Sequence, residues 1–177
     1  IYSVHQVDGG ANTYRTIFGA RRSGEGGITL YASSANNYQF WTNAIVGGWN
    51  SSPAGPLSNL AELVGVDVVA APNGLAPKNL FRNGTNTVSV NGTYQPNLTT
   101  SHTLGKNDNG GSWPYIGRIA EEIYEPKILS THERNVVETY LAIKYGISLG
   151  HNYITPDSLI VYDVSLGFNN GIFGVGK

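Results

Sequence analysis

The chain has 177 residues, a formal net charge of −1 and a pI of ≈ 6.5. Charged residues make up only 13% of it, about half of the roughly 25% that is usual in globular proteins. This near-neutral balance provides no basic surface for nucleic acid or for an anionic membrane. The absence of cysteine excludes disulfides and thiolate metal sites.

The length is sufficient for one domain with a hydrophobic core. No apolar run approaches the roughly 18 residues that a membrane-spanning helix needs. The surface polarity must come from Asn, Ser, Thr, Gln and Gly, a composition typical of secreted β-proteins and of sugar-binding or adhesive domains. The chain starts at Ile1 and contains no methionine, so we expect a processed or partial product.

Short strand-like stretches separated by turn signals fill residues 1–125. The turns include Ala71–Gly74 and the Asn-Gly pairs at Asn83 and Asn91, which tolerate the positive φ of tight turns. This spacing predicts an antiparallel β-sandwich or barrel. Because Trp49–Asn59 carries two prolines, we expect an exposed loop there. The expected strands are Ile1–Val7, Tyr14–Ala20, Gly27–Ala32, Tyr38–Thr42, Glu62–Ala70, Lys78–Arg82, Thr87–Val90, His102–Gly105 and Tyr115–Tyr124.

One helix is predicted over about residues 131–145. Ser130 and Glu133 have the spacing of a capping box, and Gly146 is placed to end the helix in the left-handed conformation. One apolar arc of the helix is predicted to pack on the sandwich: Val136, Val137, Tyr140, Leu141 and Ile143. We expect residues 1–147 to form the sandwich with its closing helix. Residues 148–177 then begin a further β segment, with a strand at Leu159–Asp163.

Three sequence motifs of catalytic proteins match in whole or in part, but each is incomplete or lies in the wrong structural context. The G-x-S-x-G at Gly146–Gly150 follows a helix, whereas a nucleophile elbow joins a strand to a following helix. Gly171–Lys177 stops before the Ser/Thr and the helix of a phosphate-binding loop. His132-Glu133 lacks the second histidine of H-E-x-x-H, because Val136 stands there.

Glu121, Glu122 and Glu125 raise the alternative of a glycoside hydrolase, which uses two carboxylates on either side of the scissile bond. In a strand, Glu121 and Glu125 share one face and lie roughly 13 Å apart, while Glu122 faces the opposite way. A retaining pair needs about 5–5.5 Å between its carboxyl groups. The spacing therefore favours a protein that is not an enzyme.

Aromatic residues in or beside loops favour a binding surface instead. Trp49, Trp113 and Tyr115 are candidates for stacking on a sugar, with Asn107 as a partner for its hydroxyl groups. Carboxylate and amide oxygens also suit Ca²⁺, so Asp108 and Asn109 form a candidate calcium site. The alternative for Trp113 and Tyr115 is packing in the core, which we favour for Trp41.

The second half of the chain resembles two known kinds of sequence. Leu80–Gly84 and Gly117–Ser130 are similar to the "LYVNG" and "GxIAEvxvYnraLS" stretches of laminin-G-type domains, which are concanavalin A-like jelly rolls. Further on, "ERNVVETYLAIKYGISLGHNY" and "GFNNGIFGVGK" resemble a segment of large secreted surface proteins of Bacteroidota. Some of those proteins are adhesins exported by the type IX route.

The resemblance implies a jelly roll at the cell surface, with calcium and glycans as ligands used by many relatives. The sequence departs from the pattern at Arg118, where the commoner residue is Asp. Such domains normally begin with one or two further strands, which we expect to be missing before Ile1. Two functions stay open: adhesion or glycan binding, with a polysaccharide or cell-surface glycan as partner, and a structural spacer that binds only neighbouring domains or chains.

Overall fold

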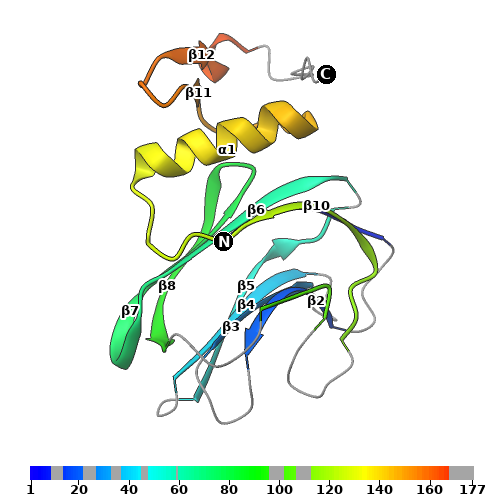
Figure 1. Ribbon diagram of the computed structural model, residues 1–177, viewed down its shortest axis with the longest axis vertical. Coiled ribbons are helices and arrows are strands. Elements are labelled where there is room, and N and C mark those ends of the chain that lie inside the picture. The colour runs from blue at the N-terminus through cyan, green and yellow to red at the C-terminus, as the bar shows by residue number, and fades with distance from the viewer. Residues whose placement is uncertain are drawn as a thin grey trace.

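The fold is a sandwich of two antiparallel five-stranded β-sheets with one α-helix on the outer side (Figure 1). It is seen in a computed structural model that describes residues 1–8, 14–21, 27–32, 37–44, 48–58, 60–95, 102–106 and 113–167. Within these, the side chains of residues 21, 43, 44, 48–56, 72 and 73 are not described. The predicted fold class is confirmed.

The first sheet, sheet A, has the strand order β10-β1-β6-β7-β8. Asn83 and Gly84 form the predicted tight turn between β7 and β8, and both have positive φ. The expected turn at Ala71–Gly74 is wrong, because β7 already begins at Ala71. An irregular register between Ala71 and Ala76 accommodates the glycine and proline within the strand. The strands of sheet A are β1 (Tyr2–Val7), β6 (Glu62–Val68), β7 (Ala71–Arg82), β8 (Thr85–Tyr94) and β10 (Gly117–Ile123).

The second sheet, sheet B, has the order β5-β4-β3-β2-β9. The expected loop at Trp49–Asn59 is wrong: residues 48–56 form β5, in which Pro53 pairs with Gln39. β5 is an edge strand, where a residue without an N–H does not interrupt the hydrogen bonding of the sheet. The strands of sheet B are β2 (Arg15–Arg21), β3 (Gly27–Ala32), β4 (Asn37–Ala44), β5 (Gly48–Pro56) and β9 (Thr103–Leu104).

The main hydrophobic core lies between the two sheets. Alternation along the strands places Leu30 and Phe40 of sheet B against Val64 and Leu80 of sheet A, and all four are fully buried. The amine of Lys78 is also buried here and donates to the hydroxyl of Thr42 at 3.1 Å. The two sheets are therefore held together by a continuous core that fixes what each sheet presents on its outer face.

Helix α1 (Thr131–Tyr145) lies on the outer face of sheet A, above β6 and β10 in Figure 1. Its ends are as predicted: Ser130 and Glu133 form the capping box, and Gly146 ends the helix with φ 67°. Across the described parts of the chain, no helix has the length and apolar character needed to cross a membrane.

The predicted apolar arc of α1 is partly wrong. Leu141 is fully buried, whereas Tyr140 is 48% exposed and Glu138 and Thr139 are buried in its place. The reason is a second contact surface, because β11 (Tyr153–Ile154) and β12 (Ile160–Tyr162) form a small hairpin on the far side of the helix (Figure 1). Thr139 accepts a hydrogen bond from the backbone of Ile154 at 3.0 Å.

A second hydrophobic cluster joins sheet A, the helix and the hairpin. It contains Tyr2 and Leu63 from sheet A, Leu141 from α1, and Leu149 and Tyr153 from the C-terminal segment. Whether a domain boundary lies between residues 147 and 148 stays a prediction. In the structure, side chains on both sides of that position share this cluster.

Candidate functional site

Four aromatic side chains gather on the face of sheet B that points away from the core. We call Tyr14, Tyr31, Trp41 and Trp113 the outer aromatic cluster. Tyr31 of β3 and Trp41 of β4 alternate with the core residues of their strands. Tyr14 directly precedes β2, and the carbonyl of Trp113 accepts a hydrogen bond from Thr16 in that strand at 3.0 Å. The rings thus come from segments far apart in the chain.

The rings of the outer aromatic cluster are in mutual contact. The Trp113 ring centroid lies 4.8 Å from that of Tyr14 and 5.5 Å from that of Trp41. Trp41 lies 5.0 Å from Tyr31 in an edge-to-face arrangement, a favourable geometry for aromatic pairs. Tyr31 is fully buried beneath the others, whereas Tyr14, Trp41 and Trp113 are half-buried. The cluster therefore presents a fixed, partly exposed aromatic surface.

Polar groups lie among and beside these rings. The Tyr31 hydroxyl donates to the side-chain oxygen of Gln39 at 2.5 Å. Thr29 pairs in register with Trp41, and Thr16 pairs with Tyr31. Both threonine hydroxyls are buried, and neither has a hydrogen-bond partner among the residues that the structure describes. Unsatisfied buried hydroxyls of this kind are uncommon in folded proteins, and here they adjoin the aromatic surface.

Of the residues that the sequence grouped as a glycan site, the structure turns Tyr115 away from Trp113. Trp113 belongs to the outer aromatic cluster together with Trp41, which we had expected in the core. Tyr115 is turned toward β1, where its hydroxyl donates to the carbonyl of Gln6 at 2.7 Å. Trp49 lies in β5, paired in register with Asn43.

The candidate calcium loop falls outside the described residues, which resume at Trp113. This applies to Asn107 as a glycan partner and to Asp108 and Asn109 as metal ligands, so these assignments stay predictions. Within the ranges that the structure does describe, no three His, Cys, Asp or Glu side chains converge as metal ligands.

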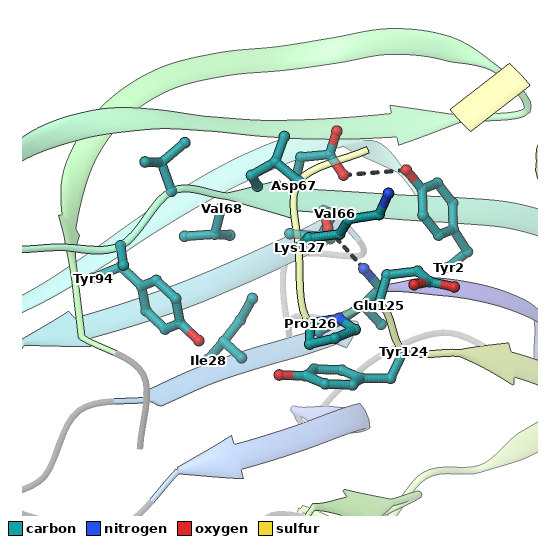
Figure 2. Close-up of a pocket in the computed structure, with 14 residues that line it drawn as sticks. Tyr2, Ile28, Val66, Asp67, Val68, Tyr94, Tyr124, Glu125, Pro126 and Lys127 are labelled. Atoms are coloured by element: carbon teal, nitrogen blue, oxygen red, sulfur yellow. Dashed lines mark hydrogen bonds between the residues drawn. The ribbon is translucent and has the colours of Figure 1, made fainter. Parts of the chain in front are cut away.

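A separate pocket of ≈ 420 Å³ opens at one end of the sandwich (Figure 2). We call it the end pocket. Val66 of sheet A and Ile28 of sheet B line its floor, and Tyr94 and Tyr124 line its sides. In Figure 2 the hydroxyl ends of both tyrosines point toward Ile28. Glu125, in the connection from β10 to α1, lies at its rim.

The three glutamates do not form a catalytic pair. Glu121 faces the helix, where its carboxylate accepts from Lys144 and Tyr145, each at 2.8 Å; the hydrogen bond from Lys144 lowers its pKa. Glu122 pairs with Ser3 and faces the opposite side of the strand, where burial raises its pKa to about 8. A glycoside hydrolase pairs a protonated carboxyl group, which acts as general acid, with an ionised one. Glu121 and Glu122 cannot form such a pair, because they lie on opposite faces of one strand.

A buried chain of hydrogen bonds has the residue types of a catalytic triad. Ser3 contacts Nδ1 of His5 at 3.1 Å, and Nε2 of His5 contacts the hydroxyl of Tyr38 at 2.9 Å. Tyr38 donates to Glu62 at 2.8 Å, and Arg82 pairs with the same carboxylate. Ser3, His5 and Tyr38 are at most 1% exposed. Because no substrate reaches them, we assign this chain to the core.

Comparison with known proteins places the fold. Among solved structures, the CBM40 of the Ruminococcus gnavus IT-sialidase, a carbohydrate-binding module, superposes with a TM-score of 0.52. The alignment covers 75% of this chain and 77% of that one, at 13% sequence identity. The two chains share a fold. At this identity the likeness extends to the sandwich architecture and not to individual residues.

Sequence comparison covers less of the chain. A family described as a domain of unknown function (DUF8202) matches residues 133–177, which include most of α1 and the β11–β12 hairpin. No curated protein sequence matches significantly.

The sequence analysis missed both the outer aromatic cluster as a unit and the end pocket. Alternation along β3 and β4 contained a signal for the cluster, since Tyr31 and Trp41 alternate with Leu30 and Phe40. No comparable signal marks the end pocket, because Tyr94 ends β8 whereas Tyr124 follows β10, and only the folded chain brings them together.

Proposed function

We propose that the protein is a non-catalytic glycan-binding module of an extracellular surface protein and that the outer aromatic cluster is its contact surface. The observation that carries this proposal is the pair of half-buried tryptophans, Trp41 and Trp113, held in contact on the face of sheet B away from the core. Neither tryptophan belongs to the main core between the sheets.

The chemistry of the cluster suits a sugar. Flat aromatic rings stack on the apolar faces of pyranoses, and nearby amide and hydroxyl groups satisfy the hydroxyl groups of the ligand. Binding sites commonly combine an apolar, aromatic surface with a few polar groups that fix orientation. Gln39 is such a group beside Tyr31. Only 13% of the residues are charged, which favours ligands that are recognised by stacking and hydrogen bonding rather than by ion pairs.

The similarity in fold to a protein named as a carbohydrate-binding module supports this class of function. The extracellular setting, the role in adhesion and export by the type IX route rest on the resemblance in sequence to surface proteins of Bacteroidota. They belong to the proposal and specify no particular glycan.

The direct test is a glycan array followed by calorimetry on the glycans that bind. We expect Trp113→Ala to weaken binding roughly 10-fold or more, because truncating an aromatic anchor at a binding surface costs about 2 kcal/mol. The matched control is Tyr140→Ala, which removes an exposed aromatic ring from α1 on the opposite side of the molecule. Equal binding by both variants would remove the cluster from the proposal.

Calcium at Asp108 and Asn109 stays part of the proposal. The same calorimetry, repeated after treatment with EDTA, tests it. The site is supported if EDTA abolishes glycan binding, if added Ca²⁺ restores it, and if Ca²⁺ does not restore it in Asp108→Asn. Glycan binding that EDTA leaves unchanged rejects the site.

A structural spacer is the second candidate, and one feature favours it. Leu159, Ile160 and Val161 of the C-terminal hairpin are between 57% and 62% exposed, which is a large apolar surface for so small an element. A spacer that contacts a neighbouring chain there would form oligomers that Ile160→Lys disrupts. A monodisperse monomer in light scattering would argue against contact between copies of this chain.

A further inference from the structure

We propose that the end pocket is a second, independent site, which takes an uncharged pyranose residue. Its ≈ 420 Å³ lies within the usual range for small-ligand sites, about 300–1,000 Å³. It lies between the two sheets and the β10–α1 connection, whereas the outer aromatic cluster lies on the far side of sheet B. The inference therefore does not require that cluster to bind sugar.

The side walls of the pocket are two pre-positioned tyrosines. The Tyr124 ring stacks on Phe18 with 6.3 Å between centroids and lies 4.7 Å from His102, yet the residue is 47% exposed. Tyr94 packs against the main core. Each ring is packed against the protein on one side and accessible on the other. The apolar face of a sugar can therefore stack on it without the loss of side-chain conformational entropy that ordering a mobile ring would cost.

The tyrosine hydroxyls are available to a ligand. Across the described residues, neither Tyr94 nor Tyr124 makes a hydrogen bond with its hydroxyl, and Figure 2 shows both turned toward Ile28. Burial, with a smaller contribution from Tyr124, raises the pKa of Tyr94 to about 12. The Tyr94 hydroxyl is therefore protonated at neutral pH, so it both donates and accepts. Two such groups across an apolar floor match the alternating hydroxyls of a pyranose.

The charges around the pocket select against anionic sugars. The carboxylate of Asp67 accepts from Tyr2 at 3.2 Å and lies 3.8 Å from Arg134. Lys127 is paired with Glu133.

Among the charged side chains that line the pocket, Glu125 makes no hydrogen bond to another described residue. Its carboxylate accepts from ligand hydroxyls and repels a ligand carboxylate. Lys127 is the cationic side chain among the described residues that line the pocket, and it is already paired with Glu133. An anionic sugar therefore finds no free counter-charge there. The pocket therefore selects uncharged sugars over acidic ones.

The experiment is a titration of the ¹⁵N-labelled chain with glucose, galactose and N-acetylglucosamine, with glucuronic acid as the anionic comparator. We expect at least one neutral sugar to shift the amides of Val68–Ala70 and Tyr124–Glu125. In Tyr94→Phe/Tyr124→Phe the dissociation constant should rise about 5-fold or more, because two hydroxyl contacts are lost while packing is kept. Tyr140→Phe is the matched control.

Glucuronic acid should bind at least about 5-fold more weakly than the best neutral sugar. Three results would overturn the inference: no shift with any neutral sugar, shifts unchanged in the double Phe variant, or equal binding of glucuronic acid. Trp113→Ala separates the two sites, since it should weaken binding at the outer aromatic cluster and leave this titration unchanged. Each site can therefore fail without the other.

Discussion

Tyr38 links the two sheets through a buried chain of polar side chains. It reaches from β4 in sheet B to His5 and Glu62 in sheet A, with contacts of 2.9 and 2.8 Å. Because Tyr38 donates to Glu62, it accepts from Nε2 of His5, and Nδ1 accepts from Ser3. Burial lowers the pKa of His5 to about 3, so this neutral arrangement persists at physiological pH.

We predict that Tyr38→Phe lowers the free energy of unfolding by about 1–3 kcal/mol, because it leaves a buried carboxylate oxygen and a buried imidazole N–H without their partner. Urea denaturation measures the change. Tyr140→Phe is the control: its hydroxyl makes exposed contacts with Glu121 and Lys144, so we expect a change within about 0.5 kcal/mol. Equal effects in the two variants would contradict the assigned role.

Residues of this kind mark a limit of sequence reasoning. Glu62 and Lys78 are buried here although charged side chains are mostly exposed in proteins, and His5 is fully buried although histidine is of intermediate burial. Their burial depends on partners that are distant in the chain, such as Tyr38 for Glu62 and Thr42 for Lys78. No local sequence pattern predicts these long-range hydrogen bonds.

At the scale of elements, His151 fastens the C-terminal segment to α1. Its Nε2 lies 2.7 Å from the carboxylate of Glu138, and its Nδ1 lies 2.9 Å from the carbonyl of Asn152. Both ring nitrogens thus face acceptors, and an imidazole that donates from both nitrogens is positively charged. Burial alone would lower the pKa of His151, but the hydrogen bonds to Glu138 and Asn152 outweigh it and raise the pKa above 6.5.

We therefore predict that this contact contributes most to stability below pH 6.5 and loses its contribution as the pH rises through the higher folded-state pKa. The sign follows because the folded state holds the proton more tightly than the unfolded state. Urea denaturation across roughly pH 6 to pH 9 measures the loss. His151→Gln should remove this component, and His102→Gln, at an exposed position, should retain it. A pH profile unchanged by His151→Gln would refute the assignment.

The helix shows which parts of an element its own sequence determines. Ser130, Glu133 and Gly146 act within a few residues of one another, so its ends were predictable. The buried face was only partly predictable, because α1 has two partners. One arc packs on sheet A, while Glu138 and Thr139 contact the segment that follows the helix.

For the whole molecule, sheet A is the central layer. The main core lies on one of its faces, and the second hydrophobic cluster, which we call the α1 cluster, lies on the other. We predict that Leu141→Ala costs about 2–5 kcal/mol, because Leu141 is fully buried in the α1 cluster. The helical and aromatic circular dichroism signals should be lost in one shared transition at lower temperature. Leu159→Ala, at a residue that is 62% exposed, should change little.

Two separate transitions, with only the helical one shifted by Leu141→Ala, would contradict this account. Sheet A shares its strands with both clusters: β1 supplies Tyr2 to one, and β6 supplies Val64 to the other. Loss of the helix contacts therefore has to weaken the sandwich as well.

Fold class and most strands followed from local patterns, since alternation and turn residues act over short distances. β5 was missed because its prolines read as a loop, and only its edge position in sheet B makes them compatible with a strand. The outer aromatic cluster was found in part, through Trp113. Alternation along β3 and β4 marks Tyr31 and Trp41 as facing away from the core, but only the strand register brings the two rings together.

The most direct test of the central claim uses the indole N–H signals of the three tryptophans. A glycan that the array identifies is titrated into the ¹⁵N-labelled chain, with the indoles assigned by single substitution. We predict that the signals of Trp41 and Trp113 shift together, while the amides of Thr131–Tyr145 do not move. Saturable binding that leaves both indole signals unchanged would contradict a glycan site at the outer aromatic cluster.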